Sequence, residues 1–117
     1  MTEHALQNEI LREFGTNPTI RLWRANCGVG VVGDVSRIMD ACRRLRISAR
    51  MVSFGVPGQA DLTGILDGGR RLEIEVKTAT GRQSKEQQNY ERMIVSKGGI
   101  YVLARSVEDV RAGIEGF

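Results

Sequence analysis

Residues 61–77 read DLTGILDGGRRLEIEVK, two apolar runs on either side of a glycine pair. From residue 72 onward, apolar and charged side chains alternate, which predicts a β-strand with one apolar face and one charged face. The apolar face carries Leu72, Ile74 and Val76, and the charged face carries Glu73, Glu75 and Lys77. Gly68 and Gly69 can take the positive φ that a tight turn needs. The stretch therefore predicts a β-hairpin.

The register of this hairpin decides which side chains meet. A three-residue turn pairs Leu66 with Arg70 and, counting back, Asp61 with Glu75; directly opposed residues share a face with about 5 Å between their Cβ atoms. Such carboxylates repel each other unless a cation lies between them, and oxygen ligands suit Mg²⁺ or Mn²⁺. We therefore expect a divalent metal site at Asp61 and Glu75, where Lys77 can orient or activate water. The same register directs five apolar side chains toward a core: Leu62, Leu66, Leu72, Ile74 and Val76.

These charged residues also have purely structural explanations. Glu73, Glu75 and Lys77 could form an ordinary solvated face, and Lys77 could neutralise Asp61 in a structural ion pair. Against this, Asp61 enters a strand that should be substantially buried, where an uncompensated carboxylate costs several kcal/mol. Two acids would also compete for one lysine, and a cation resolves the remaining negative charge.

Composition limits the class of protein. A chain of 117 residues is expected to form one domain over 1–117, and the absence of a long apolar run predicts a cytoplasmic protein with no membrane span and no signal peptide. Cys27 and Cys42 stand apart and His4 is the only histidine, so common zinc sites lack ligands. The net charge of +3 suits a polyanion partner such as DNA, although an ordinary solvated surface explains it equally well.

Periodicity predicts the other elements. We expect a helix over 3–14, a strand over 20–26, a helix that begins at residue 84 and ends before 98–99, a strand over 100–103 and a short helix from 106. Residues 31–44 are ambiguous, although apolar residues among them recur at helical spacing. Clean alternation after residue 45 predicts an extended arm over 45–54.

Two polar residues on the predicted helices point toward the same centre. Glu3 lies on the apolar stripe of the first helix and could join Asp61 and Glu75, although a first-turn acid also complements the helix dipole. Gln87 shares a helix face with Tyr90 and could reach the acidic cluster. The capping arrangement of Ser84 and Gln87 explains this glutamine equally well by spacing alone.

Several motifs together carry a family resemblance. The main three are Gly58-Gln59-Ala60-Asp61, Glu75-Val76-Lys77 and Ser84-x-x-Gln87. Further matches are Glu3-x-x-Leu6-Gln7-x-x-Ile10, Trp23-Arg24-Ala25-Asn26-x-Gly28 and Gly98-Gly99-Ile100-Tyr101-Val102. Together they resemble the PD-(D/E)xK nuclease superfamily, and more narrowly the VRR-NUC (virus-type replication-repair nuclease) domains. Ala60 departs from the proline of the superfamily name, which affects the loop and removes no ligand.

The resemblance implies both a fold and an activity. The fold would be α/β, with a restriction-endonuclease-like mixed β-sheet flanked by helices in the order α-β-β-β-α-β-α. The activity would be DNA cleavage by a metal-dependent endonuclease. The implied metal ligands are Glu3, Asp61, Glu75 and the Val76 carbonyl, and the implied catalytic residues are Asp61, Glu75, Lys77 and Gln87.

Small members of this family are similar to Holliday-junction resolvases and are typical of phages and prophages. Resolving a four-way junction requires two cuts, so we expect a homodimer, with 31–54 as an interlocking arm or alternatively a peripheral hairpin. Phosphate contacts are expected at element ends and loops, at Arg24, Asn26, Arg82 and Lys85. The alternatives are a DNA-binding module that does not cut, a nuclease acting on flaps or single strands, and an RNA-directed or purely interaction role.

Overall fold

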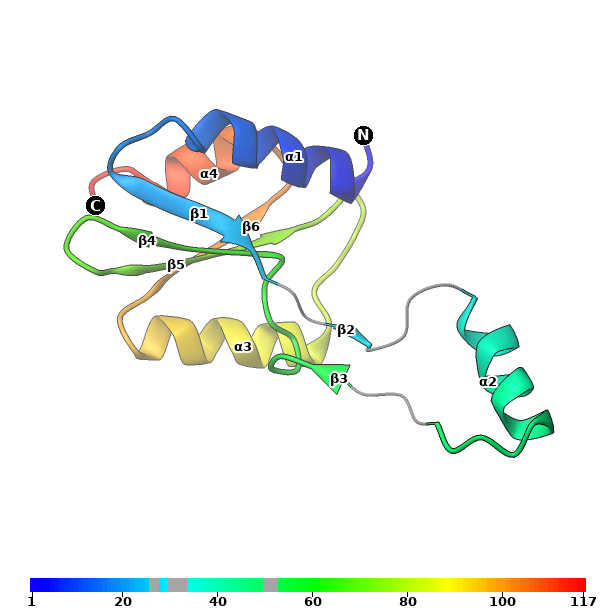
Figure 1. The fold of residues 1–117 in the computed structure, drawn as a ribbon. Helices are drawn as coiled ribbons and strands as arrows, with labels where there is room; N and C mark the ends of the chain where they lie inside the picture. Colours follow the sequence, from blue (N-terminus) through cyan, green and yellow to red (C-terminus); the bar gives the residue numbers. More distant parts are fainter. Residues whose placement is uncertain (26–27, 30–33, 50–52) are drawn as a thin grey trace. The chain divides into compact units, whose positions relative to one another are not determined.

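The computed structural model describes residues 1–25, 28–29, 34–49 and 53–117. These residues fall into two compact units, one formed by Met1–Ala25 with Pro57–Phe117 and the other by Asn26–Val56 (Figure 1). The larger unit contains α1 (Glu3–Phe14), β1 (Ile20–Arg24), β4 (Leu62–Leu66), β5 (Arg71–Val76), α3 (Lys85–Ser96), β6 (Ile100–Ala104) and α4 (Val107–Ile114). The expected α/β class, with a mixed sheet and flanking helices, is confirmed.

The sheet of the larger unit has the strand order β1-β4-β5-β6, with the first three strands antiparallel and β6 parallel to β5. Leu62 lies opposite Ile74, as the hairpin register predicts. The turn closes with a 2.9 Å hydrogen bond from the Leu66 amide to the Arg70 carbonyl. Gly68 and Gly69 have φ values of 88° and 86°, so the turn uses their conformational freedom. Asp61 therefore lies immediately before β4, at the same end of the sheet as Glu75.

Helices cover both faces of this sheet. In Figure 1, α1 and α4 lie on one side and α3 on the other. The main core lies under α1 and α4 and includes all five apolar residues expected from the register. On the opposite side, Tyr90 and Ile94 of α3 pack with Ala60. Since α3 covers this face, Glu73 and Glu75 are only 0% and 3% exposed, and the solvated-face explanation for these two glutamates is wrong.

The helix ends follow their capping residues. Ser84 and Gln87 form a reciprocal capping box before α3, and the Ser106 hydroxyl accepts a hydrogen bond from the Asp109 amide at the start of α4. After α3, Gly98 has a φ of 86° and turns the chain toward β6. None of the helices in the described ranges is long and apolar enough to cross a membrane.

The smaller unit differs from the expectation. It contains β2 (Gly28–Val29), α2 (Val35–Arg44) and β3 (Ser53–Phe54), with β2 and β3 antiparallel. The extended arm predicted over 45–54 is wrong over 45–49, where the structure has no strand, while residues 53–54 form β3 and residues 50–52 lie outside the described residues. The apolar residues at helical spacing before residue 45 do lie in a helix, α2. Asp34 caps this helix by accepting a hydrogen bond from the Arg37 amide at 3.2 Å.

Candidate active site

Two carboxylates lie together where β4 begins and β5 ends. The Asp61 side chain is half-buried, and its Oδ2 accepts a 2.8 Å hydrogen bond from the Val76 amide. The Asp61 carbonyl accepts a 2.9 Å hydrogen bond from the Ala25 amide, which extends the pairing of β1 with β4. The backbone on both sides therefore fixes Asp61 beside Glu75.

The pKa of Glu75 is strongly perturbed. Burial raises its pKa from 4.5 to about 8, the negative charge of Asp61 adds to this effect and Lys77 opposes it. Its Oε2 atom is buried and has no hydrogen-bond partner among the described residues. A buried, partnerless carboxylate oxygen is costly, so this carboxyl needs either a proton or a cation.

Lys77 and Gln87 approach the other oxygen of Glu75. The Lys77 Nζ lies 3.7 Å from Glu75 Oε1, and the lysine side chain is only 14% exposed. Gln87 donates from Nε2 to the same Oε1 at 2.9 Å, while its own Oε1 accepts from the Ser84 amide at 2.8 Å. Both explanations of Gln87 are therefore correct, because one side chain caps α3 and binds Glu75. This glutamine ties the helix to the acidic pair.

The loop after Lys77 is held by a residue that no sequence motif indicates. Arg105, just after β6, donates from Nη1 to the Gly81 carbonyl at 2.8 Å and to the Thr78 carbonyl. Its own amide donates to Asp109 at 2.8 Å. These contacts fix the chain on the C-terminal side of Lys77. The partners are backbone carbonyls distant in sequence, so spacing alone could not reveal them.

The structure does not place Glu3 beside the acidic pair. Among the described residues, no three His, Cys, Asp or Glu side chains come close enough together to hold a metal ion. Glu3 is the exposed first residue of α1, where it complements the helix dipole. Its charge still makes the last and smallest of the named contributions that raise the pKa of Glu75. Of the expected metal ligands, the structure therefore brings the side chains of Asp61 and Glu75 together.

The predicted phosphate contacts differ in their surroundings. Arg24 donates to Gln7 Oε1 at 2.6 Å and also to Asn8, so α1 holds its guanidinium. Arg82 and Lys85 are exposed, in the loop after Lys77 and at the start of α3. Asn26 lies outside the described residues.

Trp23 also differs from the usual core tryptophan. It is 46% exposed and pairs in register with Thr63, on the sheet face that carries the carboxylates. Because it is the only tryptophan in the chain, its fluorescence can report ligand binding near this face.

Glu73 is the buried acid that the sequence did not single out. Its Oε1 accepts three hydrogen bonds, from Thr63 at 3.0 Å, Arg71 at 2.6 Å and Tyr90 at 3.0 Å. Burial, followed by the charge of Glu73, raises the pKa of Tyr90 to about 12, so this phenol remains a donor. Glu73 thus links β4, β5 and α3, and it lies two residues before Glu75 on the same face of β5. The alternating pattern had placed it on the charged face, but only the position of α3 explains why it is buried.

We predict that Tyr90→Phe lowers the free energy of unfolding by about 1–3 kcal/mol, since it removes one donor from a buried carboxylate. Urea unfolding measures this loss. Tyr101→Phe is the matched control, because that hydroxyl only accepts a 3.2 Å hydrogen bond from Gln83. Equal losses in the two variants would show that Glu73 does not need the Tyr90 hydroxyl.

Gly58 sets the approach of the Asp61 loop to α3. It has a φ of 76°, and a Cβ atom there would lie 2.2 Å from the Glu86 carbonyl oxygen and 2.6 Å from the Gln87 amide nitrogen. Only glycine fits this contact without displacing the first turn of the helix. Gly58 therefore keeps Gln87 within reach of the acidic pair.

Replacing Gly58 with alanine should destabilise the protein more than Gly68→Ala. Both glycines have positive φ, but a Cβ at Gly68 would meet no described atom within 4 Å. We expect a loss of about 1 kcal/mol for Gly68→Ala from backbone strain, and of roughly 2–4 kcal/mol for Gly58→Ala, which adds the steric clash. Thermal unfolding of the two variants separates the cost of backbone strain from the cost of the steric clash. Similar values would mean that the loop relaxes away from α3.

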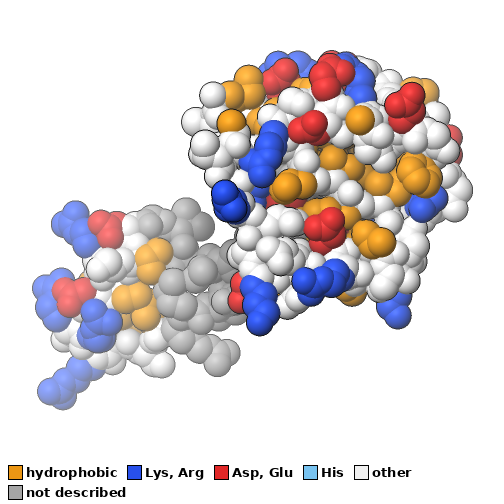
Figure 2. Space-filling view, turned by 180° about the vertical axis from the view of Figure 1, so that it is seen from behind, with side chains coloured by type: hydrophobic (Ala, Val, Ile, Leu, Met, Phe, Trp, Pro, Cys, Tyr) orange, Lys and Arg blue, Asp and Glu red, His pale blue; other side chains and the backbone are white. Residues whose placement is uncertain are grey.

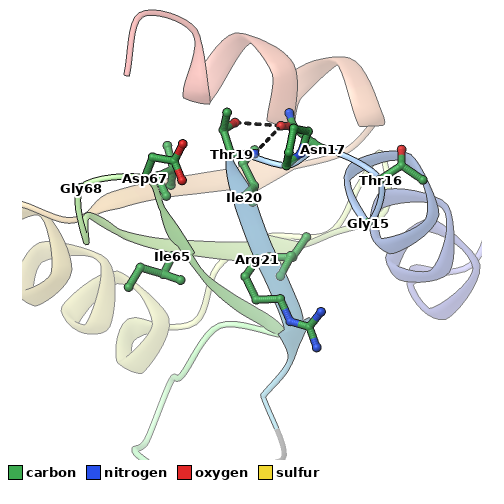
Figure 3. A pocket seen from close by; sticks show the side chains of 12 residues that line it. Gly15, Thr16, Asn17, Thr19, Ile20, Arg21, Ile65, Asp67 and Gly68 are labelled. Carbon is green, nitrogen blue, oxygen red and sulfur yellow. Dashed lines mark hydrogen bonds between the residues drawn. The ribbon is translucent and has the colours of Figure 1, made fainter.

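The pocket in Figure 3 lies away from these residues. It encloses about 500 Å³ between the loop after α1 and the β4–β5 turn. Its walls include Asn17, Thr19 and Asp67, and Asn17 Oδ1 accepts hydrogen bonds from both the amide and the hydroxyl of Thr19. None of the predicted site residues lines it. The candidate site is instead defined by converging side chains at the other end of the hairpin.

Comparison of the chain with models of known protein families and with curated protein sequences gives no match. Any functional assignment therefore depends on the geometry of the site and on the motifs in the sequence.

Proposed function

We propose that this protein is a divalent-metal-dependent endonuclease that hydrolyses DNA phosphodiester bonds. One observation carries the proposal: Glu75 is buried beside Asp61, one of its oxygens lacks a partner in the described part of the chain, and Lys77 and Gln87 approach the other oxygen. This combination of two acids, a lysine and a glutamine supports membership of the VRR-NUC group of PD-(D/E)xK nucleases. The corresponding proposal for the fold is a restriction-endonuclease-like sheet.

The residues at the site fit Mg²⁺ or Mn²⁺. The donor set is all oxygen, from Asp61, Glu75 and the Val76 carbonyl, and a hard divalent cation prefers such ligands. A cation would satisfy the Glu75 oxygen that has no hydrogen-bond partner within the described residues. When bound, the ion polarises the scissile phosphate and lowers the pKa of water. Glu3 is proposed to contribute negative charge at a longer distance.

The chain's own groups have distinct tasks in this proposal. The Lys77 ammonium orients the attacking water or stabilises the charge that develops on the phosphate. Gln87 fixes the orientation of the Glu75 carboxylate through its 2.9 Å hydrogen bond. The Val76 amide does the same for Asp61. Lys77 also lowers the cost of keeping Glu75 ionised next to another acid.

Plasmid nicking tests the proposal directly. Supercoiled DNA should be cut in Mg²⁺ or Mn²⁺ and left intact in EDTA. Ca²⁺ should support DNA binding with little cutting, because its coordination is looser. The fluorescence of Trp23 provides an independent titration of the metal without DNA. Full activity in EDTA would contradict the proposal, and so would DNA binding without cutting in every metal, which would favour a non-cleaving module.

We further propose that the substrate is branched DNA and that the protein acts as a homodimer of phage or prophage origin. A chain with one such site makes one cut, and a two-fold dimer supplies the second cut that a four-way junction needs. A panel of linear, flap, splayed and four-way DNA, run beside light scattering, tests both points. A monomer that cuts only flaps or single strands would contradict the resolvase proposal while leaving the nuclease proposal intact.

A further inference from the structure

The net charge of the protein resides entirely in its smaller unit. Residues 26–56 contain five arginines and two aspartates, which accounts for the whole net charge of +3. The rest of the chain has twelve basic and twelve acidic residues and is neutral overall. A positive charge confined to one short segment indicates a contact with a polyanion better than the same charge spread over the surface.

The arginines of α2 are exposed and only partly neutralised. Arg43 and Arg44 share one carboxylate, Asp40, at 3.7 and 3.4 Å, and their side chains are 70% and 73% exposed. Arg37 and Arg46 are exposed as well. Figure 2 shows basic side chains spread over the part of the surface formed by this unit. In the larger unit, by contrast, internal contacts engage several arginines, namely Arg24, Arg71, Arg105 and Arg111.

Helical geometry places two of these arginines, Arg37 and Arg44, on one side of α2. With 3.6 residues per turn, Arg37 and Arg44 lie on the same face two turns apart, a separation of roughly 10 Å. Arg43 lies about 120° around the helix from Arg37, at the border of the apolar face, and Arg46 lies in the turn after the helix. The opposite face carries the apolar residues Val35, Ile38, Met39 and Cys42. Since each DNA strand presents one phosphate per about 3.4 Å of axis, the basic face spans roughly three phosphates.

Arg46 has a backbone conformation that usually selects glycine. Its φ is 55°, in the left-handed region, and the hydrogen bond from the Ile47 amide to the Cys42 carbonyl closes the helix around it at 2.8 Å. An arginine at this position is strained where a glycine is not. This strain indicates that the arginine side chain has a use that glycine cannot provide.

We propose that Arg37, Arg43, Arg44 and Arg46, the arginine face, bind the phosphate backbone of duplex DNA without reading its sequence. The inference rests on the proposed function, because it takes DNA as the substrate, and it assigns a DNA contact outside the catalytic residues. Guanidinium groups suit phosphate oxygens through paired hydrogen bonds. Anionic membranes are the weaker match, because α2 lacks the aromatic residues typical of interfacial helices.

The test is a binding titration with the full chain, in Ca²⁺, on a labelled duplex over a range of KCl concentrations. The triple variant Arg37→Gln, Arg44→Gln, Arg46→Gln is compared with Arg12→Gln, Arg92→Gln, Lys97→Gln, which removes the same charge from exposed positions of the larger unit. We expect the arginine-face variant to bind at least about tenfold more weakly, and the slope of log K against log salt to fall by about 2–3. The control should bind within about threefold of wild type with a smaller change in slope.

Arg46→Gly separates binding from folding. Glycine relieves the strain, so the midpoint of thermal unfolding should stay the same or rise, while DNA affinity falls about threefold. Equal DNA affinity in the two triple variants overturns the inference and leaves the nuclease proposal standing, provided wild type still cuts DNA in Mg²⁺. Wild-type protein that neither binds nor cuts DNA overturns both.

Two further results would identify a different partner for this unit. If the arginine-face variant loses binding to phosphatidylserine vesicles but not to DNA, the face is a membrane contact. Light scattering could instead show that the arginine-face variant is monomeric. If its affinity for DNA then returns to the wild-type value at protein concentrations that restore the dimer, the smaller unit is a dimer contact. Either result overturns the inference.

Discussion

Lys77→Ala should reduce the rate of Mg²⁺-dependent DNA cleavage by roughly 10²- to 10³-fold, about 3–4 kcal/mol of transition-state stabilisation. Asp61→Asn and Glu75→Gln should have effects at least as large, because each removes a negative ligand while keeping the side-chain shape. The physical reason is that, in the proposed mechanism, the three groups act on the same phosphate. Single-turnover cleavage of a labelled substrate measures the chemical step.

The matched control for Lys77→Ala is Lys97→Ala, which removes an exposed lysine after α3 and should cleave at the wild-type rate. Circular dichroism and the thermal midpoint verify that each variant is folded. Gln87→Met should reduce the rate of cleavage by a smaller factor of about ten, because in the proposed mechanism Gln87 orients Glu75 and does not contact the phosphate. If the Lys77→Ala protein cleaved DNA at the wild-type rate, Lys77 would have no part in the mechanism.

The hairpin was predictable because local geometry determines it. The glycine turn fixes the register, and the register fixes which side chains oppose each other, so the proximity of Asp61 and Glu75 follows from residues 61–77 alone. The helix that brings Gln87 was predictable from its capping box. Its contact with Glu75 was one of two open explanations, and the structure shows that the same side chain makes both sets of hydrogen bonds.

The sequence could not predict which faces of the sheet are covered. Alternation identifies two faces of β5 but not that α3 packs over the charged one, so the burial of Glu73 and its contact with Tyr90 were missed. Glu3 illustrates the same limit, because a residue on a helical stripe can lie beyond the end of the core. Its position at the first turn of α1 leaves it exposed.

The segment after residue 44 shows how two periodicities compete. Alternation over 45–51 resembles a strand, but a strand is stable only with a partner that satisfies its backbone groups. Within the described residues, the smaller unit pairs only Gly28–Val29 with Ser53–Phe54. The helix over Val35–Arg44 satisfies its own backbone groups and needs no such partner, so the helical spacing before residue 45 forms a helix while the alternation over 45–49 does not form a strand.

In the absence of divalent cations, the protein should lose stability as the pH rises from about 4.5 to about 8. The pKa of Glu75 is about 8 in the folded protein and near 4.5 when unfolded, so folding favours the protonated carboxyl. This contribution is fully present below the unfolded pKa and is lost as the pH rises through the folded pKa. The shift corresponds to up to roughly 5 kcal/mol. Urea unfolding in EDTA at several pH values measures it.

Mg²⁺ should reverse this loss, and by more at about pH 8.5 than at about pH 6, because protons and the cation compete for the same oxygens. Below the pKa of Glu75, the apparent affinity for Mg²⁺, followed by Trp23 fluorescence, should weaken about tenfold for each pH unit. Glu75→Gln is the control, since it keeps the shape of the side chain and cannot ionise. Glu75→Gln should lose most of the pH dependence of the free energy of unfolding and most of its stabilisation by Mg²⁺. Subtracting the free energy of unfolding of this variant from that of wild type at each pH cancels the contributions of the other titrating groups. Equal stabilisation of wild type by Mg²⁺ at both pH values would mean that the ion binds elsewhere, and that the proton on Glu75 does not occupy the position of a metal.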